Sequence, residues 1–263
     1  GDVRNLGLLR KLSKNCDTIY HLAAIIGVDV VSERNLETME YEFEGLKNVC
    51  FAAKENKISR IIYSSSSGVY GKLNYDKNVK ENVAVAPVSA YAIAKRSAEL
   101  YLQNFYSEFK ISSIAVRLFN VYGPRQENSD VGGVVSIFAR RVLQDKPIII
   151  YGDGSQIRSF TYVNDVVDIN LLALNKSEME GNAYNCASGI SVSILELANL
   201  VAKSLGKPDH PIEFREWKPG DIRHFDVSNS KLKDLGFSWE TSFEKGLDKT
   251  LAWSKDWIAR EYT

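Results

Sequence analysis

The sequence predicts an α/β fold, with a twisted, doubly wound parallel sheet followed by a smaller α+β lobe. In the first half of the chain, short apolar runs alternate with segments of helical periodicity. Strands that alternate with helices pair in parallel through right-handed crossovers. After Pro124 the pattern changes to glycine-rich turns and shorter elements. We therefore expect a first domain over residues 1–125 and a second lobe over 126–263, from which the chain can cross back to the sheet.

Hydrophobic periodicity gives the individual elements. Apolar residues recur at core spacing in two long helices, as with Leu46 and Val49 in the first and Ala98 and Leu102 in the second. The strands expected in the first half are Thr18–Leu22, Arg60–Ser64 and Ser113–Leu118, and the helices are Glu37–Asn56 and Ala90–Phe109. In the second half we expect strands at Ile148–Tyr151 and around Phe160–Val163, and helices at Asn164–Asn175, Ile194–Leu205 and Phe243–Tyr262.

Composition excludes several classes of function. The 263 residues include 33 basic and 33 acidic ones, so no basic excess points to nucleic acid or to an anionic membrane. The three cysteines are scattered, and the three histidines lack metal-ligand spacing, so we expect no disulfide framework and no metal. No apolar run approaches the roughly 20 residues of a membrane span, and no signal peptide opens the sequence, so we expect a cytoplasmic protein.

Tyr91 and Lys95 form the strongest chemical pattern. Four residues apart on a helix, they share one face, and an ammonium group beside a phenol lowers the phenol pKa. Upstream, the serine run Ser64–Ser67 follows a strand, where ligands of parallel sheets bind. A serine there with Tyr91 and Lys95 makes a proton-transfer triad. The same spacing at Tyr106 and Lys110 is interpreted as coincidental.

Seven motifs in order resemble those of the NAD-dependent epimerase/dehydratase family of extended short-chain dehydrogenases. The likeness runs the whole length of the chain. The motifs are His21–Ala24, Tyr63–Gly71, Tyr91–Lys95, Arg117–Arg125, Tyr151–Phe160, Tyr184–Gly189 and Lys218–Asp221.

The resemblance implies a Rossmann-like, NAD-binding first domain and a nucleotide-sugar-binding second lobe. It implies that Tyr91 is the catalytic tyrosine and that Lys95 binds the ribose and tunes it. The implied catalytic residues are Ser66, Tyr91 and Lys95. The implied cofactor contacts are Asp2, Val3, Leu22, Ala23, Ala24, Ser64, Tyr91 and Lys95. The implied substrate contacts are Asn120 near the phosphates, Tyr151 on the base, Arg158 and Lys218 on the diphosphate, and Asp221 beside them.

Three departures from the family pattern are informative. The Gly-x-x-Gly-x-x-Gly segment that cradles the pyrophosphate would lie upstream of Asp2, so we expect a longer parent protein whose first strand and helix are missing here, leaving the sheet truncated. Glu42 stands where the family commonly has Asn. Dehydratases of the family carry acidic residues directly after the catalytic Ser or Thr, and decarboxylases usually keep the second of these. Ser67 and Gly68 stand at these positions.

The lack of carboxylates after Ser66 favours epimerisation. The sequence therefore predicts an NAD-dependent epimerase that acts at C4 of a UDP-hexose through a transient 4-keto sugar. A 4,6-dehydratase or a decarboxylase of the same family, and a non-catalytic truncated homologue, remain as alternatives. The resemblance also implies a homodimer formed through the helices Glu37–Asn56 and Ala90–Phe109, with Phe51, Tyr101 and Phe105 at its centre.

Overall fold

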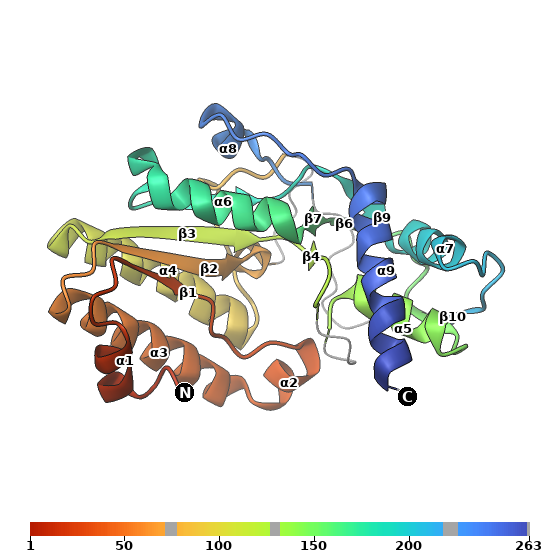
Figure 1. Cartoon of the computed structure of the whole chain (residues 1–263), viewed down its shortest axis with the longest axis horizontal. Coiled ribbons are helices and arrows are strands. Elements are labelled where there is room, and N and C mark those ends of the chain that lie inside the picture. Colours follow the sequence, from red (N-terminus) through yellow and green to blue (C-terminus); the bar gives the residue numbers. More distant parts are fainter. Residues whose placement is uncertain (72–77, 127–131, 218–225, 262–263) are drawn as a thin grey trace. The chain divides into compact units, whose positions relative to one another are not determined.

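The computed structural model describes residues 1–71, 78–126, 132–217 and 226–261 (Figure 1). The chain forms two compact units, each built from separated stretches of sequence. The first unit comprises Gly1–Leu73, Glu81–Leu118 and Val167–Cys186, and the second comprises Asn74–Lys80, Phe119–Val166 and Ala187–Thr263. Val167–Cys186 therefore belongs to the first unit, although it lies well beyond residue 125.

A four-stranded parallel sheet organises the first unit, in the order β1-β2-β3-β8. Most residues of its two central strands are buried, as expected for a parallel sheet that is covered on both faces. Ser66 at the end of β2 pairs in register with Leu118 at the end of β3. The strands are β1 (Thr18–His21), β2 (Arg60–Ser66), β3 (Ser112–Leu118) and β8 (Ala183–Cys186).

Two long helices, α3 and α4, pack on one face of this sheet, and α6 lies on the other (Figure 1). A core between the sheet and helices α3 and α4 includes Leu46, Val49, Ala98 and Leu102. The helical elements that contribute to this unit are α1 (Leu6–Leu12), α2 (Val28–Glu33), α3 (Asn35–Glu55), η1 (Ser67–Tyr70), α4 (Ala90–Phe109), α6 (Val163–Asn175), whose first residues belong to the second unit, and η2 (Ser177–Met179).

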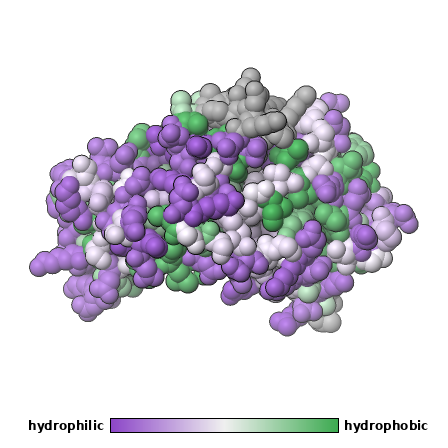
Figure 2. Space-filling model, turned by 90° about the horizontal axis from the view of Figure 1, so that it is seen from above, coloured by the Kyte–Doolittle hydropathy of each residue, from purple (hydrophilic) through white to green (hydrophobic). Residues whose placement is uncertain are grey.

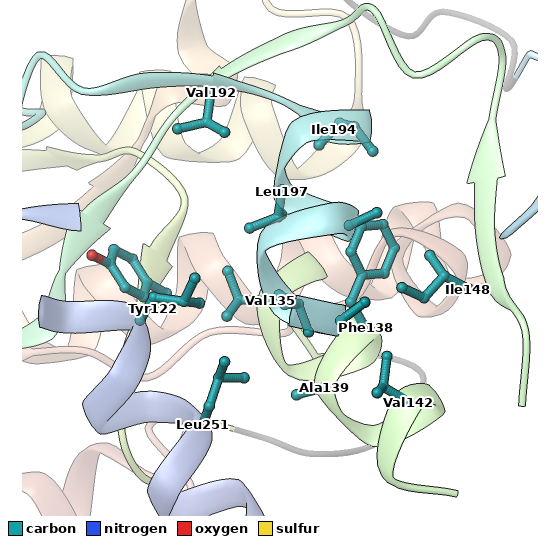
Figure 3. Close-up of a cluster of buried hydrophobic side chains, with 14 of the residues drawn as sticks. Tyr122, Val135, Phe138, Ala139, Val142, Ile148, Val192, Ile194, Leu197 and Leu251 are labelled. Atoms are coloured by element: carbon teal, nitrogen blue, oxygen red, sulfur yellow. The ribbon is translucent and has the colours of Figure 1, made fainter. Parts of the chain in front are cut away.

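The second unit combines short paired strands with three helices around its own hydrophobic core. Phe138 and Val142 of α5, Leu197 of α7 and Leu251 of α9 meet in this core (Figure 3). Strand β5 pairs in parallel with β10, β4 with β7 in parallel, and β6 with β9 antiparallel. The elements are β4 (Val121–Tyr122), α5 (Val134–Leu143), β5 (Ile148–Tyr151), β6 (Ile157–Ser159), β7 (Thr161–Tyr162), β9 (Ser191–Ser193), α7 (Ile194–Ser204), β10 (Ile212–Arg215), α8 (Ser230–Asp234) and α9 (Phe243–Glu261).

The surface is mixed in character. Figure 2 shows hydrophilic residues interspersed with smaller hydrophobic patches on one face of the molecule. Large apolar side chains that are more than a third exposed include Phe43 and Phe51 on α3 and Leu100 and Tyr101 on α4. Within the ranges that the structure describes, no helix is both long enough and apolar enough to cross a membrane.

Candidate active site

The candidate active site begins where β1 and β2 end. These strands pair in parallel, so their carboxyl ends lie side by side, at the edge of the sheet where ligands of such folds bind. Leu22, Ala23 and Ala24 follow β1, while Ser64 and Ser66 close β2. The Ser66 hydroxyl accepts a hydrogen bond from the backbone N–H of Gly68 at 3.1 Å and so caps the short helix η1. This bond fixes where the serine side chain stands.

Helix α4 brings Tyr91 and Lys95 to the same place. Ser89 caps the helix by accepting a hydrogen bond from the Ala92 N–H at 3.1 Å, which puts Tyr91 in the first turn. The Ser66 side chain interacts with the Tyr91 phenol and lowers its pKa, and Lys95 Nζ lies 5.4 Å from the centroid of the Tyr91 ring. The three residues of the expected triad are thus adjacent.

The second Tyr-x-x-x-Lys pattern has a different environment. Lys110 is the residue that ends α4, in the left-handed backbone region with φ 57°. It is exposed, and its Nζ lies 6.0 Å from the Tyr106 ring centroid. Tyr106 and Lys110 lie at the opposite end of α4 from Tyr91 and Lys95, which supports the interpretation of this second pattern as coincidental.

Lys95 has a partner that sequence reasoning missed. Its Nζ lies 3.0 Å from Oε2 of Glu42 on α3, and the side chains are only 2% and 1% exposed. The Tyr63 hydroxyl donates to the same carboxylate at 3.4 Å, and Lys95 Nζ stands 4.6 Å from the Tyr63 ring centroid. The only sequence signal for this contact was the acidic residue at the Glu42 position of a core-facing helix.

The ion pair changes the electrostatics that the sequence predicted for Tyr91. Burial and the nearby Glu42 carboxylate raise the pKa of Tyr91 to about 12, and the interaction with Ser66 offsets this only partly. Burial lowers the pKa of Lys95, while Glu42 acts in the opposite direction. The expected lowering of the Tyr91 pKa by Lys95 is therefore wrong, because burial of the phenol, together with the Glu42 carboxylate, raises this pKa.

A cavity of about 330 Å³ opens beside Tyr91. Its wall is mostly apolar, with a few polar groups, which is the usual character of a small-molecule site. Because Tyr91 belongs to the wall, a ligand in this cavity can reach the phenol. The lining residues are Ile26, Gly27, Val31, Ser32, Asn35, Ser89 and Tyr91.

The other expected cofactor contacts also lie in the first unit. Asp2 forms an exposed ion pair with Arg4, with 2.7 Å between the carboxylate and the guanidinium. Val3 lies against Gly45 of α3, where a Cβ atom would approach the valine side chain to 2.7 Å. Leu22 is 62% exposed directly after β1. These positions leave Asp2 and Leu22 accessible to a ligand.

Three of the expected substrate contacts lie in the second unit. The Asn120 side-chain amide donates to the Ser159 carbonyl at 2.8 Å, which brings Asn120 next to Arg158 on β6. The Arg158 guanidinium donates to the Ile157 carbonyl at 3.0 Å. Tyr151 closes β5. Lys218 and Asp221 lie outside the described residues.

An open hollow of about 510 Å³ beside the Gly152 turn contains residues that sequence reasoning missed. Arg215 lies opposite Tyr151 in the β5–β10 register, and its guanidinium donates to the Glu213 carboxylate at 2.7 Å. The Trp217 ring passes so close to Gly152 that a Cβ there would lie 2.4 Å from it. Gly152 has φ 80°, so two constraints favour glycine at this turn. The hollow is lined by Gly152, Asp153, Phe214, Arg215, Glu216 and Trp217.

Comparison with known proteins identifies the family. A profile described as "NAD dependent epimerase/dehydratase family" matches residues 1–187, and the chain belongs to this family. The UDP-glucose 4-epimerase of Mycolicibacterium smegmatis is 31% identical over 241 residues, covering 89% of this chain and 75% of that protein. The UDP-N-acetyl-alpha-D-glucosaminuronate decarboxylase of Bacillus cytotoxicus is 32% identical over 259 residues, covering 94% of this chain and 79% of that protein.

A solved structure confirms the fold. The UDP-glucose 4-epimerase of Thermotoga maritima, determined with UDP-glucose, superimposes with a TM-score of 0.93 at 28% identity and covers 98% of this chain and 84% of that one. The predicted Rossmann-like parallel sheet is thus confirmed, as is membership of a family that uses NAD.

The first unit has groups suited to a nicotinamide nucleotide. Buried polar atoms without a hydrogen-bond partner among the described residues include His21 Nε2 and Glu42 Oε1. Burial, together with the Lys95 charge, lowers the pKa of His21 to about 4, so its ring is neutral at physiological pH. The Tyr91 phenol and the Lys95 ammonium add donors that suit ribose hydroxyls. These groups fit the cofactor of the family.

Proposed function

We propose that the protein is an NAD-dependent nucleotide-sugar epimerase that acts at C4 of a UDP-hexose through a transient 4-keto sugar. The observation that carries the proposal is the segment after Ser66. Ser67 and Gly68 bring no carboxylate there, and the carboxylate of Glu42 is buried in its ion pair with Lys95. Elimination of water needs an acid near the leaving hydroxyl, whereas epimerisation at C4 does not.

Each residue of the triad has a separate role in this proposal. Tyr91 takes the proton from the C4 hydroxyl and returns it after the sugar has turned. Ser66 shares a hydrogen bond with that hydroxyl and with the phenol. Lys95 holds the ribose and supplies the positive charge that the phenolate needs. Bound NAD supplies the hydride acceptor and regains its starting state after each turnover.

The nucleotide part of the substrate is assigned to the second unit. A guanidinium group can contact a diphosphate through two parallel N–H donors, so Arg158 is proposed to bind the diphosphate. Asn120 is proposed to contact the phosphate region, and Tyr151 to stack on the base. Arg215 adds a second cation next to Tyr151. Lys218 and Asp221 keep their proposed roles as substrate contacts.

The deciding assay is product analysis of the protein supplied with NAD and with either UDP-glucose or UDP-N-acetylglucosamine. We expect the C4 epimer of at least one substrate. A 4-keto-6-deoxy product from the unmodified protein would contradict the proposal and favour a 4,6-dehydratase. Release of carbon dioxide from a UDP-uronic acid would favour a decarboxylase.

A double variant tests whether the missing carboxylates are what excludes the dehydratase reaction. Ser67→Asp combined with Gly68→Glu introduces the acids that Ser67 and Gly68 lack. A Cβ at Gly68 would lie 3.4 Å from Ser66 Oγ and 3.5 Å from the Ala92 Cβ, which are ordinary contacts. We expect this variant to form some 4-keto-6-deoxy sugar. Gly68→Gln with the original Ser67 is the matched uncharged control and should form none.

We also propose that the protein is a homodimer, with α3 and α4 forming the interface. The exposed apolar side chains on these helices support this, with Phe51 38%, Leu100 43% and Tyr101 41% exposed. Phe105, which the sequence reading placed at the centre of the interface, is only 4% exposed and packs in the core of its own unit. Phe105 is therefore assigned to the core instead.

We expect light scattering during gel filtration to give the mass of a dimer at micromolar concentration. Tyr101→Glu should shift the mass toward the monomer, because a charge in a buried apolar contact is costly. Val167→Glu, at an apolar position of α6 that is 51% exposed, is the matched control and should leave the mass unchanged. A monomeric wild-type protein would contradict the proposal.

A further inference from the structure

We propose that Glu42 is a positioning residue of the proton-transfer site, where its carboxylate holds the Lys95 ammonium and offsets that charge at the Tyr91 phenol. The inference rests on the proposed function of Tyr91 and Lys95 and assigns an additional residue, on a different helix, to the same site. It concerns the protonation state of the Tyr91 phenol before the ligands bind.

The geometry of the contact is that of a specific ion pair. Oε2 of Glu42 lies 3.0 Å from Lys95 Nζ, and both side chains are at least 98% buried. Removing two charges from water is costly, and a buried pair is stable only when its geometry is good and its other polar atoms find partners. The Tyr63 hydroxyl donates to the same oxygen at 3.4 Å, whereas Glu42 Oε1 is buried without a hydrogen-bond partner among the described residues.

The Lys95 ammonium of this ion pair lies close to the Tyr91 ring. Lys95 Nζ lies close to two aromatic rings, 4.6 Å from the Tyr63 centroid and 5.4 Å from the Tyr91 centroid. A lone ammonium at that position would stabilise the Tyr91 phenolate. Glu42, 3.0 Å from the ammonium, offsets that charge. Burial of the phenol and the Glu42 carboxylate together raise the Tyr91 pKa, so the phenol keeps its proton.

The charged and titratable groups around the pair come from every element that packs there. Among the described residues, β1 contributes His21, β2 contributes Tyr63, α3 contributes Glu42, and α4 itself contributes Glu99. The pKa of His21 is lowered to about 4 and that of Tyr63 is raised well above its usual value, in both cases chiefly by burial. Neither changes charge between pH 5 and 10, and Glu99 is bound to Arg117. Glu42 and Lys95 therefore set the charge that Tyr91 experiences.

The consequence for the reaction concerns timing. In the free protein, Tyr91 is a phenol that can donate a hydrogen bond, and it cannot act as a base near neutral pH. Oxidised NAD carries a positive charge on its nicotinamide ring, and a cation near Tyr91 would favour the phenolate. A site with a balanced ion pair thus delays ionisation of Tyr91 until the cofactor is bound.

The first experiment follows the phenol itself, in the protein without ligands. Tyrosine labelled with ¹³C at Cζ is titrated by NMR, and the Tyr91 signal is identified by its loss in Tyr91→Phe. In the unmodified protein we expect Tyr91 to stay protonated at pH 10. In Glu42→Gln, which removes the charge but keeps the shape, we expect the first deprotonation of the Tyr91–Lys95 pair to occur about one pH unit or more lower.

Two control variants separate charge from structure. Glu42→Asp keeps the carboxylate and should retain most of the wild-type titration. Glu180→Gln breaks another ion pair of the first unit, Arg60–Glu180 at 2.9 Å, and should leave the Tyr91 titration unchanged. If both variants shift Tyr91 as much as Glu42→Gln does, the effect is structural and the proposal is wrong.

The outcome does not depend on the activity assay. If Tyr91 ionises near neutral pH in the unmodified free protein, the proposal is overturned even if Glu42→Gln fails to fold. If the titrations behave as expected but no C4 epimer forms, the proposed reaction fails and the role of Glu42 stands. With an active protein, the rising limb of the pH–kcat profile should move to lower pH in Glu42→Gln.

Discussion

Replacement of Tyr91 by phenylalanine is expected to reduce kcat by roughly 10²–10⁴-fold, the usual contribution of a general acid–base group. The change removes only the hydroxyl that interacts with Ser66 and leaves the ring in place. The KM for the UDP-sugar should change little, because Tyr91 acts on a proton in transfer and does not bind the nucleotide. Steady-state kinetics with saturating NAD, with circular dichroism as a check of folding, measures both quantities.

Arg158→Ala provides the comparison. Arg158 is proposed to hold the diphosphate in the ground state and in the transition state alike, so its loss should raise KM more than it lowers kcat. The two variants should therefore divide their effects in opposite ways. Turnover close to the wild-type value in Tyr91→Phe would remove Tyr91 from the reaction and, with it, the proposed mechanism.

Glu99→Ala is expected to lower the free energy of unfolding by about 3–5 kcal/mol, because it leaves a buried guanidinium without its counter-charge. Glu99 on α4 binds Arg117 through two contacts of 2.8 Å, and the Arg117 residue is only 1% exposed. The Ser65 hydroxyl donates to the same carboxylate at 2.6 Å. Urea denaturation, followed by tryptophan fluorescence, gives the loss of stability.

Two further measurements make this expectation specific. The double variant Glu99→Leu with Arg117→Met removes both charges and should be more stable than Glu99→Ala.

Burial would raise the pKa of Glu99, but hydrogen bonds from Arg117, Ser65 and Arg96 lower it below its usual 4.5. The stabilisation is therefore present above pH 4.5 and is lost as the pH falls through the lowered pKa. A difference in unfolding free energy between wild type and Glu99→Gln that does not shrink at any acidic pH at which the protein still folds would contradict this.

Much of the fold could be predicted from the sequence where one periodicity was strong. Residues 90–109 form α4 as predicted, and α3 and the first three parallel strands differ from the prediction by a few residues at their ends. The sequence analysis did not predict the short strands β4, β6, β8, β9 and β10, or the helical elements α1, α2, η1, α5, η2 and α8. Strand β8 was hidden because Ala183–Cys186 is too short to show a period, and its hydrogen bonds come from β3, far away in the sequence.

The candidate site was predictable as a set of positions but not as a set of charges. Ser66, Tyr91 and Lys95 were found because a strand end and a helix turn fix their places. The Glu42–Lys95 pair joins two helices, and nothing in the local pattern of either helix marks that contact. The charge balance around Tyr91, and hence the direction of its pKa shift, depends on this long-range contact.

The return of the chain to the first sheet at β8 has a consequence for folding during synthesis. β3 gains its second neighbour only when residues 183–186 have been synthesised. The stretch 119–166, which belongs to the other unit, is synthesised before them. Contacts between residues so distant in sequence slow folding, because a long loop must close first. In a nascent chain that ends before Cys186, one edge of β3 is unpaired. We therefore expect chaperones to bind the chain most during this stage of translation.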